Sequence, residues 1–385
     1  MLLPLILFAH LALAQAPQFS DDSHSGRMFS FTLGARGIPS VQVLEPRPGD
    51  GYFHTNAPLP SGQIRVQTIF SDDLFWSRDG ITYQKLDETL KDSEGRLYSL
   101  PAHEGSNYFR VGPSPPHDEA AYYTYEQYLD HMTSLDPGRF LMKRVIGKSV
   151  QGRPIYGLGI TDRQVRGPKK TLWIQARQHG DEYSHSYIVE SLVDHLVDPS
   201  PPNEVFRQLR ETFFIGIVPM MNPDGAVARS RYNAHGVDLN RTWHESGNYG
   251  EEEPEVSAVH ATLDRWISRP SQTVIFAYDH HNTYEGDWGY RFDRSTVPQQ
   301  YFENQDRFVE LLTSHDPFQR RSDWQENPGT PGMARVALYL QHSLDILTIE
   351  TANAFRNNGS QVREEDLREE AIHFANALWA YIGEI

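Results

Sequence analysis

The stretch TLWIQARQHGDE at residues 171–182 decides the fold. Its apolar first half predicts a buried strand, and the turn residues that follow it separate this strand from a helical pattern at 186–197, SYIVESLVDHLV. The alternation continues with a strand in TFFIGIVPM (212–220), a helix in EVSAVHATLDRWI (255–267) and a strand in TVIFAYDH (273–280). This order predicts an α/β domain with a mainly parallel mixed sheet and helices on both faces.

The N-terminal part has a different pattern. From Gly26 to Val111, short β-branched and aromatic runs alternate with clusters of Gly, Pro, Asn and Asp. This spacing predicts a small all-β sandwich domain over residues 17–112. Pro113, Pro115 and Pro116 indicate a linker over 113–122, so the α/β domain is expected over 123–385.

Residues 1–16 are predicted to be a signal peptide. An apolar run too short to span a bilayer precedes Ala14-Gln15-Ala16, which matches the small-x-small pattern of a signal-peptidase site. The chain has no cysteine, which excludes disulfides, thiolate metal ligands and a cysteine nucleophile. We therefore expect a secreted or periplasmic protein, and a bacterial one.

Charge and hydropathy exclude two classes of partner. The 385 residues carry 35 Lys and Arg against 51 Asp and Glu, a net charge of −16, so the cationic excess typical of nucleic-acid binding is missing. No run of about 18 apolar residues is present, which excludes a membrane-spanning helix. The sequence gives no indication of the oligomeric state.

A candidate metal site follows the strand at 171–177. His179 and Glu182 form an H-x-x-E pair at the carboxyl end of this strand, the edge of an α/β sheet where sites form. A third ligand is expected from another strand end, where His280 and His281 occur together. Successive side chains of a strand point to opposite faces, so only one of the two can share a metal. Two imidazoles and one carboxylate leave a zinc position open, which is typical of a hydrolase.

Three further charged residues lie near the expected edge. Arg231 and Arg241 occur in a turn-rich segment after a strand, where a guanidinium can bind a carboxylate or stabilise an oxyanion. Glu350 ends the apolar strand in SLDILTIE, where a carboxylate can act as a general base. Each of the three could equally be a solvated surface charge.

Four segments together resemble the zinc carboxypeptidases of the carboxypeptidase A type, and within them the cytosolic-carboxypeptidase-like branch. ARQHGDE at 176–182 is similar to ARxHPGE, and PMMNPDGA at 219–226 to PMLNPDGV. RYNAHGVDLNRTW at 231–243 is similar to RxxxxGxDLNRxW, and ARVALYLQHSLDILTIE at 334–350 contains the ARV that precedes a strand ending in Glu. The resemblance covers about Tyr123 to Phe355 and implies the fold and chemistry of that family.

The resemblance implies a role for each matched residue. His179, Glu182 and His281 would bind one zinc ion, with His281 matching the His of the family's D-x-H. Glu350 would be the general base and acid for a zinc-activated water, and Arg231 would polarise the scissile carbonyl. The expected activity is therefore hydrolysis of the C-terminal bond of peptides or proteins.

The substrate's free carboxylate would be held by Asn240 and Arg241. The sequence departs from the family at Gly180-Asp181, which replaces Pro-Gly and adds an anion near the site. The substrate-capping tyrosine is not assigned, and an arginine in the specificity pocket would favour acidic C-terminal residues. The tyrosine candidates are Tyr284, Tyr290 and Tyr339, and the arginine candidates are Arg291, Arg294 and Arg335.

Two other functions fit the same residues. A zinc amidohydrolase acting on murein peptides or N-acyl amino acids also uses H-x-x-E, a late His and a DLNR-like run. An inactive binding protein is the second alternative, but every matched catalytic position is filled, which argues against it.

Overall fold

In the computed structural model the chain forms two units, Met1–Ser114 and Pro115–Ile385. The predicted signal peptide over 1–16 lies outside the described residues, as does the predicted linker apart from Tyr122. The structure describes residues 19–21, 29–33, 38–43, 51–55, 59, 62–67, 73–78, 84–86, 88–92, 95–103 and 107–112 of the first unit, and 122–244, 249–267, 274–358 and 360–383 of the second.

The described residues of the first unit form two five-stranded sheets. One has the order β1 (Phe19–Asp21), β4 (Gly51–Thr55), β10 (Tyr108–Gly112), β6 (Asp73–Ser77) and β7 (Gln84–Lys85). The other has the order β2 (Phe29–Leu33), β3 (Pro39–Val43), β5 (Gln63–Gln67), β9 (Gly95–Ser99) and β8 (Glu88–Asp92). Buried side chains of both sheets, including Val41, Ile64, Trp76 and Phe109, form one apolar core. The predicted all-β sandwich is confirmed.

The second unit is built on one mixed sheet of eight described strands. Its order is β11 (Leu141–Lys148), β12 (Pro154–Ile160), β14 (Phe213–Val218), β13 (Lys170–Ala176), β15 (Val274–Glu285), β18 (Ile346–Phe355), β16 (Trp288–Arg291) and β17 (Trp324–Glu326). The four central strands, from β14 to β18, are parallel to one another. β11 and β12 continue the sheet antiparallel on one side, and β16 pairs antiparallel with β18 on the other.

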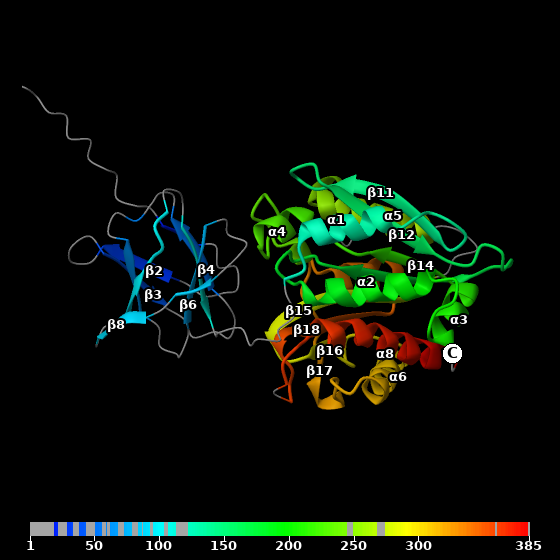
Figure 1. Cartoon of the computed structure of the whole chain (residues 1–385). Helices are drawn as coiled ribbons and strands as arrows, with labels where there is room; N and C mark the ends of the chain where they lie inside the picture. The colour runs from blue at the N-terminus through cyan, green and yellow to red at the C-terminus, as the bar shows by residue number, and fades with distance from the viewer. Residues whose placement is uncertain are drawn as a thin grey trace, which may run out of the picture. The chain divides into compact units, whose positions relative to one another are not determined.

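Helices cover both faces of this sheet, which confirms the predicted α/β fold (Figure 1). In β13, Leu172 and Ile174 enter one buried core while Trp173 enters the other, so the strand is buried on both faces. The first face packs against α1 (Tyr125–Ser134), α2 (Ser184–Val197), α3 (Glu204–Thr212), α8 (Glu364–Ile382) and most of α6 (Gln299–His315). The second face packs against α5 (Pro254–Ile267) and α7 (Ala334–His342).

The described residues of the second unit also form four short helical segments. They are α4 (Pro223–Ala228) and the 3₁₀ turns η2 (Leu239–Arg241), η3 (Tyr249–Glu251) and η4 (Arg321–Asp323). Because β13, β15 and β18 run in the same direction, the residues that follow or end them meet at one edge of the sheet. In the described part of the chain, no helix combines the length and the apolar character that crossing a bilayer requires.

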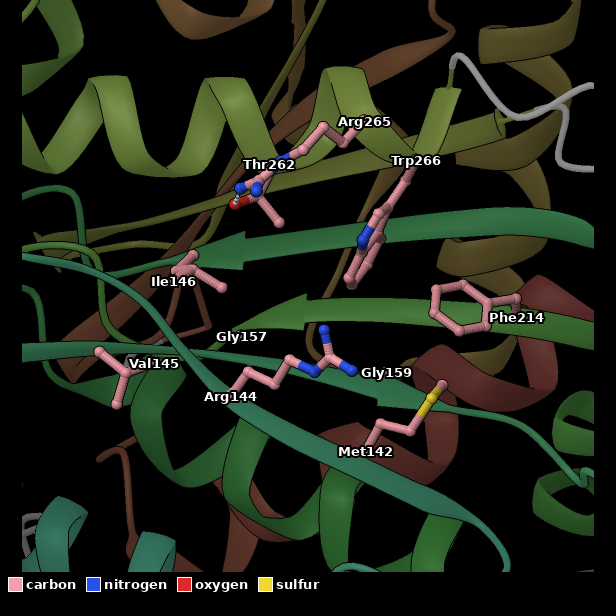
Figure 2. A pocket seen from close by; sticks show the side chains of 10 residues that line it. All are labelled: Met142, Arg144, Val145, Ile146, Gly157, Gly159, Phe214, Thr262, Arg265 and Trp266. Atoms are coloured by element: carbon pink, nitrogen blue, oxygen red, sulfur yellow. Dashed lines mark hydrogen bonds between the residues drawn. The ribbon is translucent and has the colours of Figure 1, made fainter.

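A hollow of about 330 Å³ lies over β11, β12, β14 and α5 (Figure 2). Two glycines of β12 line this hollow, and a side chain at either position would fill part of it. A Cβ on Gly157 would lie 2.6 Å from Ile146 Cγ2, and one on Gly159 would lie 2.8 Å from Phe214 Cζ. The lining residues include Trp266 and Arg144 but none of the residues implicated in catalysis or metal binding by the sequence. This hollow is therefore separate from His179, Glu182 and His281.

Candidate metal centre

His179 and Glu182 lie in the short connection between β13 and α2. Both side chains are buried, and His179 Nδ1 is 2.6 Å from Glu182 Oε1. The connection packs tightly at Gly180, where a Cβ would lie 2.0 Å from the carbonyl carbon of Gly225. Only glycine, which has no side chain, fits at this position. The turn brings the imidazole of His179 and the carboxylate of Glu182 together.

His281 reaches this point from the neighbouring strand. β15 runs parallel to β13, with Ala176 in register with His280. His281 Nδ1 lies 3.1 Å from His179 Nδ1 and 2.9 Å from Glu182 Oε2. One donor atom from each of these three residues lies within 4.8 Å of the other two, and we call the three residues the metal cluster.

His280 points to the opposite face of the sheet. Its ring packs against those of His185 and Tyr278, at centroid distances of 4.3 and 5.6 Å. Burial lowers the pKa of His280 to about 3, so this imidazole is neutral. The alternation of side chains along β15 thus brings His281, and not His280, into the metal cluster.

Each imidazole of the metal cluster has a carboxylate behind it. His179 Nε2 is 3.0 Å from Asp238 Oδ1, and His281 Nε2 is 3.1 Å from Asp279 Oδ2. Asp238 was not among the residues predicted from the sequence, although it lies in the same DLNR run as Asn240 and Arg241. The signal that could have identified Asp238 is its place two residues before Asn240, in a segment that resembles the family's site.

This arrangement fits a bound cation. An ionised carboxylate only accepts hydrogen bonds, so Asp238 and Asp279 place the protons of both imidazoles on Nε2. The two Nδ1 lone pairs then face each other and the Glu182 carboxylate. Three ligand atoms this close together can share one cation, and two imidazoles with one carboxylate suit zinc.

Arg231 is held at the metal cluster by Asp238. Arg231 Nε and Nη2 donate to Asp238 Oδ2 at 3.1 and 2.9 Å, and Nη1 lies 3.1 Å from His179 Nδ1. Burial opposes ionisation of Asp238, but its hydrogen bond with His179 and the charge of Arg231 hold the pKa of Asp238 well below its usual range. One carboxylate therefore positions both an imidazole and a guanidinium.

Glu350 lies beside His281 in the sheet. The two residues are in register on the parallel strands β15 and β18, so their side chains emerge on the same face. Burial raises the pKa of Glu350 to about 7, and the negative charge of Glu182 adds to this effect. A carboxyl group with this pKa can both accept and return a proton near neutral pH.

Asn240 contacts the metal cluster, whereas Arg241 does not. Asn240 Nδ2 lies 3.1 Å from His281 Nε2, and Asn240 Oδ1 accepts a hydrogen bond from the backbone N–H of Ala334. Arg241 is exposed, and its Nη1 donates to the carbonyl oxygen of Asn240 at 2.7 Å. The guanidinium is thus close in sequence to the site but directed at backbone.

Asp181, the anion by which the sequence departs from the family, is partly shielded from solvent. Asp181 has one carboxylate oxygen that is buried without a hydrogen-bond partner among the described residues. Burial raises the pKa of Asp181 to about 6. The residue therefore carries less negative charge near neutral pH than an exposed aspartate.

Two of the three candidate tyrosines are described at the side-chain level. Tyr290 is on β16, and both burial and the charge of Glu350 raise its pKa. Tyr339 packs against Phe292 and Tyr301 at ring-centroid distances of 4.9 and 4.7 Å. The side chain of Tyr284 lies outside the described residues. Of the two tyrosines whose side chains are described, Tyr290 is the one that interacts electrostatically with Glu350.

The three candidate arginines differ in their partners. Arg291 forms an ion pair with Asp306, and Arg294 with Glu326. Arg335 is buried, its Nη1 donates to the carbonyl oxygen of Asn327 at 2.8 Å, and its guanidinium lies over the ring of Phe292. Among the described residues no carboxylate forms an ion pair with Arg335.

Comparison with known proteins places the second unit in a family. Residues 125–314 match the family model described as zinc carboxypeptidase. Cytosolic carboxypeptidase 6 of Mus musculus is 28% identical over 196 residues, which are 49% of this chain and 35% of that protein. Cytosolic carboxypeptidase 6 of Caenorhabditis elegans is 29% identical over 160 residues, or 40% of this chain and 34% of that protein. The chain thus spans about a third of the length of these curated relatives.

Solved structures show the same fold over nearly the whole chain. A metallo-carboxypeptidase from Burkholderia cenocepacia is 19% identical with a TM-score of 0.64, covering 96% of this chain and 99% of that one. A metallo-carboxypeptidase from Pseudomonas aeruginosa is also 19% identical, with a TM-score of 0.61 and coverage of 95% and 99%. At this identity the likeness concerns the fold alone.

Proposed function

Because residues 125–314 carry a domain of the zinc carboxypeptidase family, we propose that this protein is a zinc-dependent metallocarboxypeptidase acting on the C-terminal bond of peptides or proteins. One observation carries the proposal: His179, Glu182 and His281 converge, with a carboxylate behind each imidazole. These three residues would hold one zinc ion. When bound, the ion supplies a Lewis acid and lowers the pKa of water toward roughly 7.

Glu350 and Arg231 supply the proton transfer and the charge stabilisation. Glu350 takes a proton from the attacking water and returns it to the leaving amine, a role that its raised pKa of about 7 supports. The Arg231 guanidinium, held by Asp238 beside His179, stabilises the negative charge that develops on the scissile carbonyl oxygen.

Asn240 and Arg241 bind the substrate's C-terminal carboxylate. The contact of Asn240 with His281 places an amide beside the metal cluster, and the exposed Arg241 supplies the cation. A planar guanidinium binds a carboxylate through two hydrogen bonds, which makes the enzyme an exopeptidase. In this role Arg241 exchanges its hydrogen bond to the Asn240 carbonyl oxygen for bonds to substrate.

We also propose that substrates with an acidic C-terminal residue are preferred. The support is Arg335, which is buried and lacks an ion-pairing carboxylate among the described residues. Burial lowers its pKa to about 10, so Arg335 remains charged at neutral pH. A carboxylate on the substrate side chain would supply the missing partner.

The proposal is tested with blocked dipeptides and with Glu350→Gln. We expect the wild type to release the C-terminal amino acid and a chelator to abolish this release. Glu350→Gln removes the proton acceptor and should lower kcat by about 10²- to 10⁴-fold while zinc content stays unchanged. Thr283→Ser, a conservative change on the same rim of the sheet, serves as a control. Deacylation of N-acyl amino acids without release of C-terminal residues, or unchanged turnover in Glu350→Gln, would contradict the assignment.

Export of the protein is a further proposal, supported by the pattern of residues 1–16. N-terminal sequencing of the protein from its producing cells should give a first residue at or close to Pro17, in the extracytoplasmic fraction. Recovery of protein that starts at Met1 from the cytosol would contradict export and would agree with the names of the cytosolic relatives.

A further inference from the structure

A second group of metal-ligating side chains lies between α5 and α7. It consists of His260 and Asp264 on α5 and His342, the last residue of α7. One donor atom from each residue lies within 4.8 Å of the other two, and His342 Nε2 is 2.6 Å from Asp264 Oδ1. We call these residues the α5–α7 cluster. It shares no residue with the metal cluster at the ends of β13 and β15.

The packing of α5 against α7 brings these three side chains together. His260 and Asp264 are four residues apart, so they lie on one face of α5 about one turn from each other. Both helices pack in the same apolar core, with Val259 and Leu263 of α5 and Val336 and Leu338 of α7. The donors on α5 therefore face the end of α7 through a fixed packing arrangement.

His260 has the surroundings of a metal ligand. Its Nδ1 lies 2.7 Å from Glu252 Oε1, and both side chains are completely buried. When Nδ1–H donates a hydrogen bond to this carboxylate, the lone pair of the ring is on Nε2. Asp238 holds His179 in a similar way, but through Nε2. His260 Nε2 lies 2.5 Å from Gln341 Oε1. In this tautomer the lone pair of Nε2 faces the amide oxygen, which cannot donate a hydrogen bond to it.

We propose that His260, Asp264 and His342 bind a second divalent ion, and that this ion is zinc. Two imidazoles and one carboxylate are ligands that zinc takes in tetrahedral sites, with the fourth position left to water. The side chains of Asp264 and His342 are 20% and 14% exposed, so an ion can reach the cluster from solvent although His260 is buried.

The second ion would join α5 to α7 and so support the substrate site. The first residue of α7, Ala334, donates its N–H to Asn240 Oδ1, and Arg335 follows it. The ring of His260 lies 5.1 Å from that of Trp243, whose Nε1 donates to Gln178 Oε1 beside His179. An ion at the far end of α7 therefore fixes the helix that positions both Asn240 and Arg335.

The test counts zinc in the full-length protein. The wild type and variants are saturated with zinc, dialysed and analysed by mass spectrometry of the metal. We expect two zinc ions per wild-type chain and one in Asp264→Asn or in His342→Gln. The matched control is Asp194→Asn, which breaks another contact between His and Asp, at 2.8 Å from His131, and should retain two ions.

The variant His179→Ala distinguishes zinc binding at the α5–α7 cluster from zinc binding at the metal cluster. This variant removes the metal cluster, so it should still bind one ion, and zinc added to its metal-free form should raise its Tm. The double variant His179→Ala/His342→Gln should bind none and show no such rise. One zinc ion in the wild type with no loss in Asp264→Asn and His342→Gln would overturn the proposal and leave the α5–α7 cluster as a close contact of His and Asp side chains without an ion. A failed metallocarboxypeptidase assay would not affect either result.

Discussion

Arg335 keeps a charged guanidinium out of water, over the ring of Phe292 and bonded to a backbone carbonyl. Burying a cation without a carboxylate costs several kcal/mol of desolvation, which neighbouring packing alone does not recover. Arg291 and Arg294, in contrast, have acidic partners within the fold. Of the three arginines suggested by the sequence, Arg335 is therefore the one whose environment calls for a carboxylate from a ligand.

Replacing Arg335 should change specificity more than turnover. Arg335→Met keeps most of the stem that packs on Phe292 and removes the charge. A charged hydrogen bond contributes roughly 1.5–3 kcal/mol, so kcat/KM for a Glu-terminated peptide should fall about 10- to 100-fold. The value for a Leu-terminated peptide should stay the same or rise.

The exposed Arg294 provides the control for this substitution. Arg294→Met breaks an ion pair with Glu326 at the surface and should leave the ratio of the two kcat/KM values unchanged. Equal rates of the wild-type protein on the two peptides would show that Arg335 does not contact the substrate side chain.

At the scale of a single element, β18 contributes to both stability and chemistry. Glu350 lies within the strand beside His281, and Asp345 immediately precedes the strand. Asp345 is buried, and one of its carboxylate oxygens has no hydrogen-bond partner among the described residues. Burial raises the pKa of Asp345 to about 7. The strand thus begins beside a carboxyl group that the fold keeps protonated below about pH 7.

The pKa of Asp345 predicts a loss of stability as the pH rises. Below about pH 4 the group is protonated in both the folded and the unfolded chain, so it has no net effect. Between about pH 4 and 7 the unfolded chain releases the proton while the folded chain keeps it, and the free energy of unfolding falls. Above about pH 7 the loss is complete, on the order of 2–4 kcal/mol.

Asp345→Asn should therefore gain stability relative to the wild type between pH 4 and pH 8. Denaturant unfolding at both pH values measures the difference. Glu303→Gln is the control, because Glu303 is exposed on α6 and should not alter the pH dependence. A difference between Asp345→Asn and the wild type that is the same at both pH values would show that Asp345 is already ionised in the folded state.

At the scale of the whole molecule, two units with separate apolar cores explain why the chain has two kinds of sequence pattern. In the first unit the described strands are short, and strands such as Gln63–Gln67 alternate buried and more exposed residues. In the second unit the central strands are buried on both faces, as Phe213–Val218 shows. The period of two and the continuous apolar run are both visible without coordinates, which is why both architectures could be predicted.

The sequence alone determined the fold class and the local part of the metal cluster. His179 and Glu182 are three residues apart in a turn after a strand, so covalent geometry alone keeps them close. The resemblance to the zinc carboxypeptidases also named His281, Arg231 and Glu350. The structure places His281 and Arg231 beside this pair, and Glu350 beside His281.

Only the tertiary structure decided which groups lie behind and around these residues. Asp238 contacts His179 across 59 positions of sequence, and Arg241 is directed at backbone rather than at the metal cluster. His260 and Gln341 meet across 81 positions, and no sequence pattern marked them. Such contacts depend on strand register and helix packing, which the whole chain sets together, so spacing along the sequence carries no record of them.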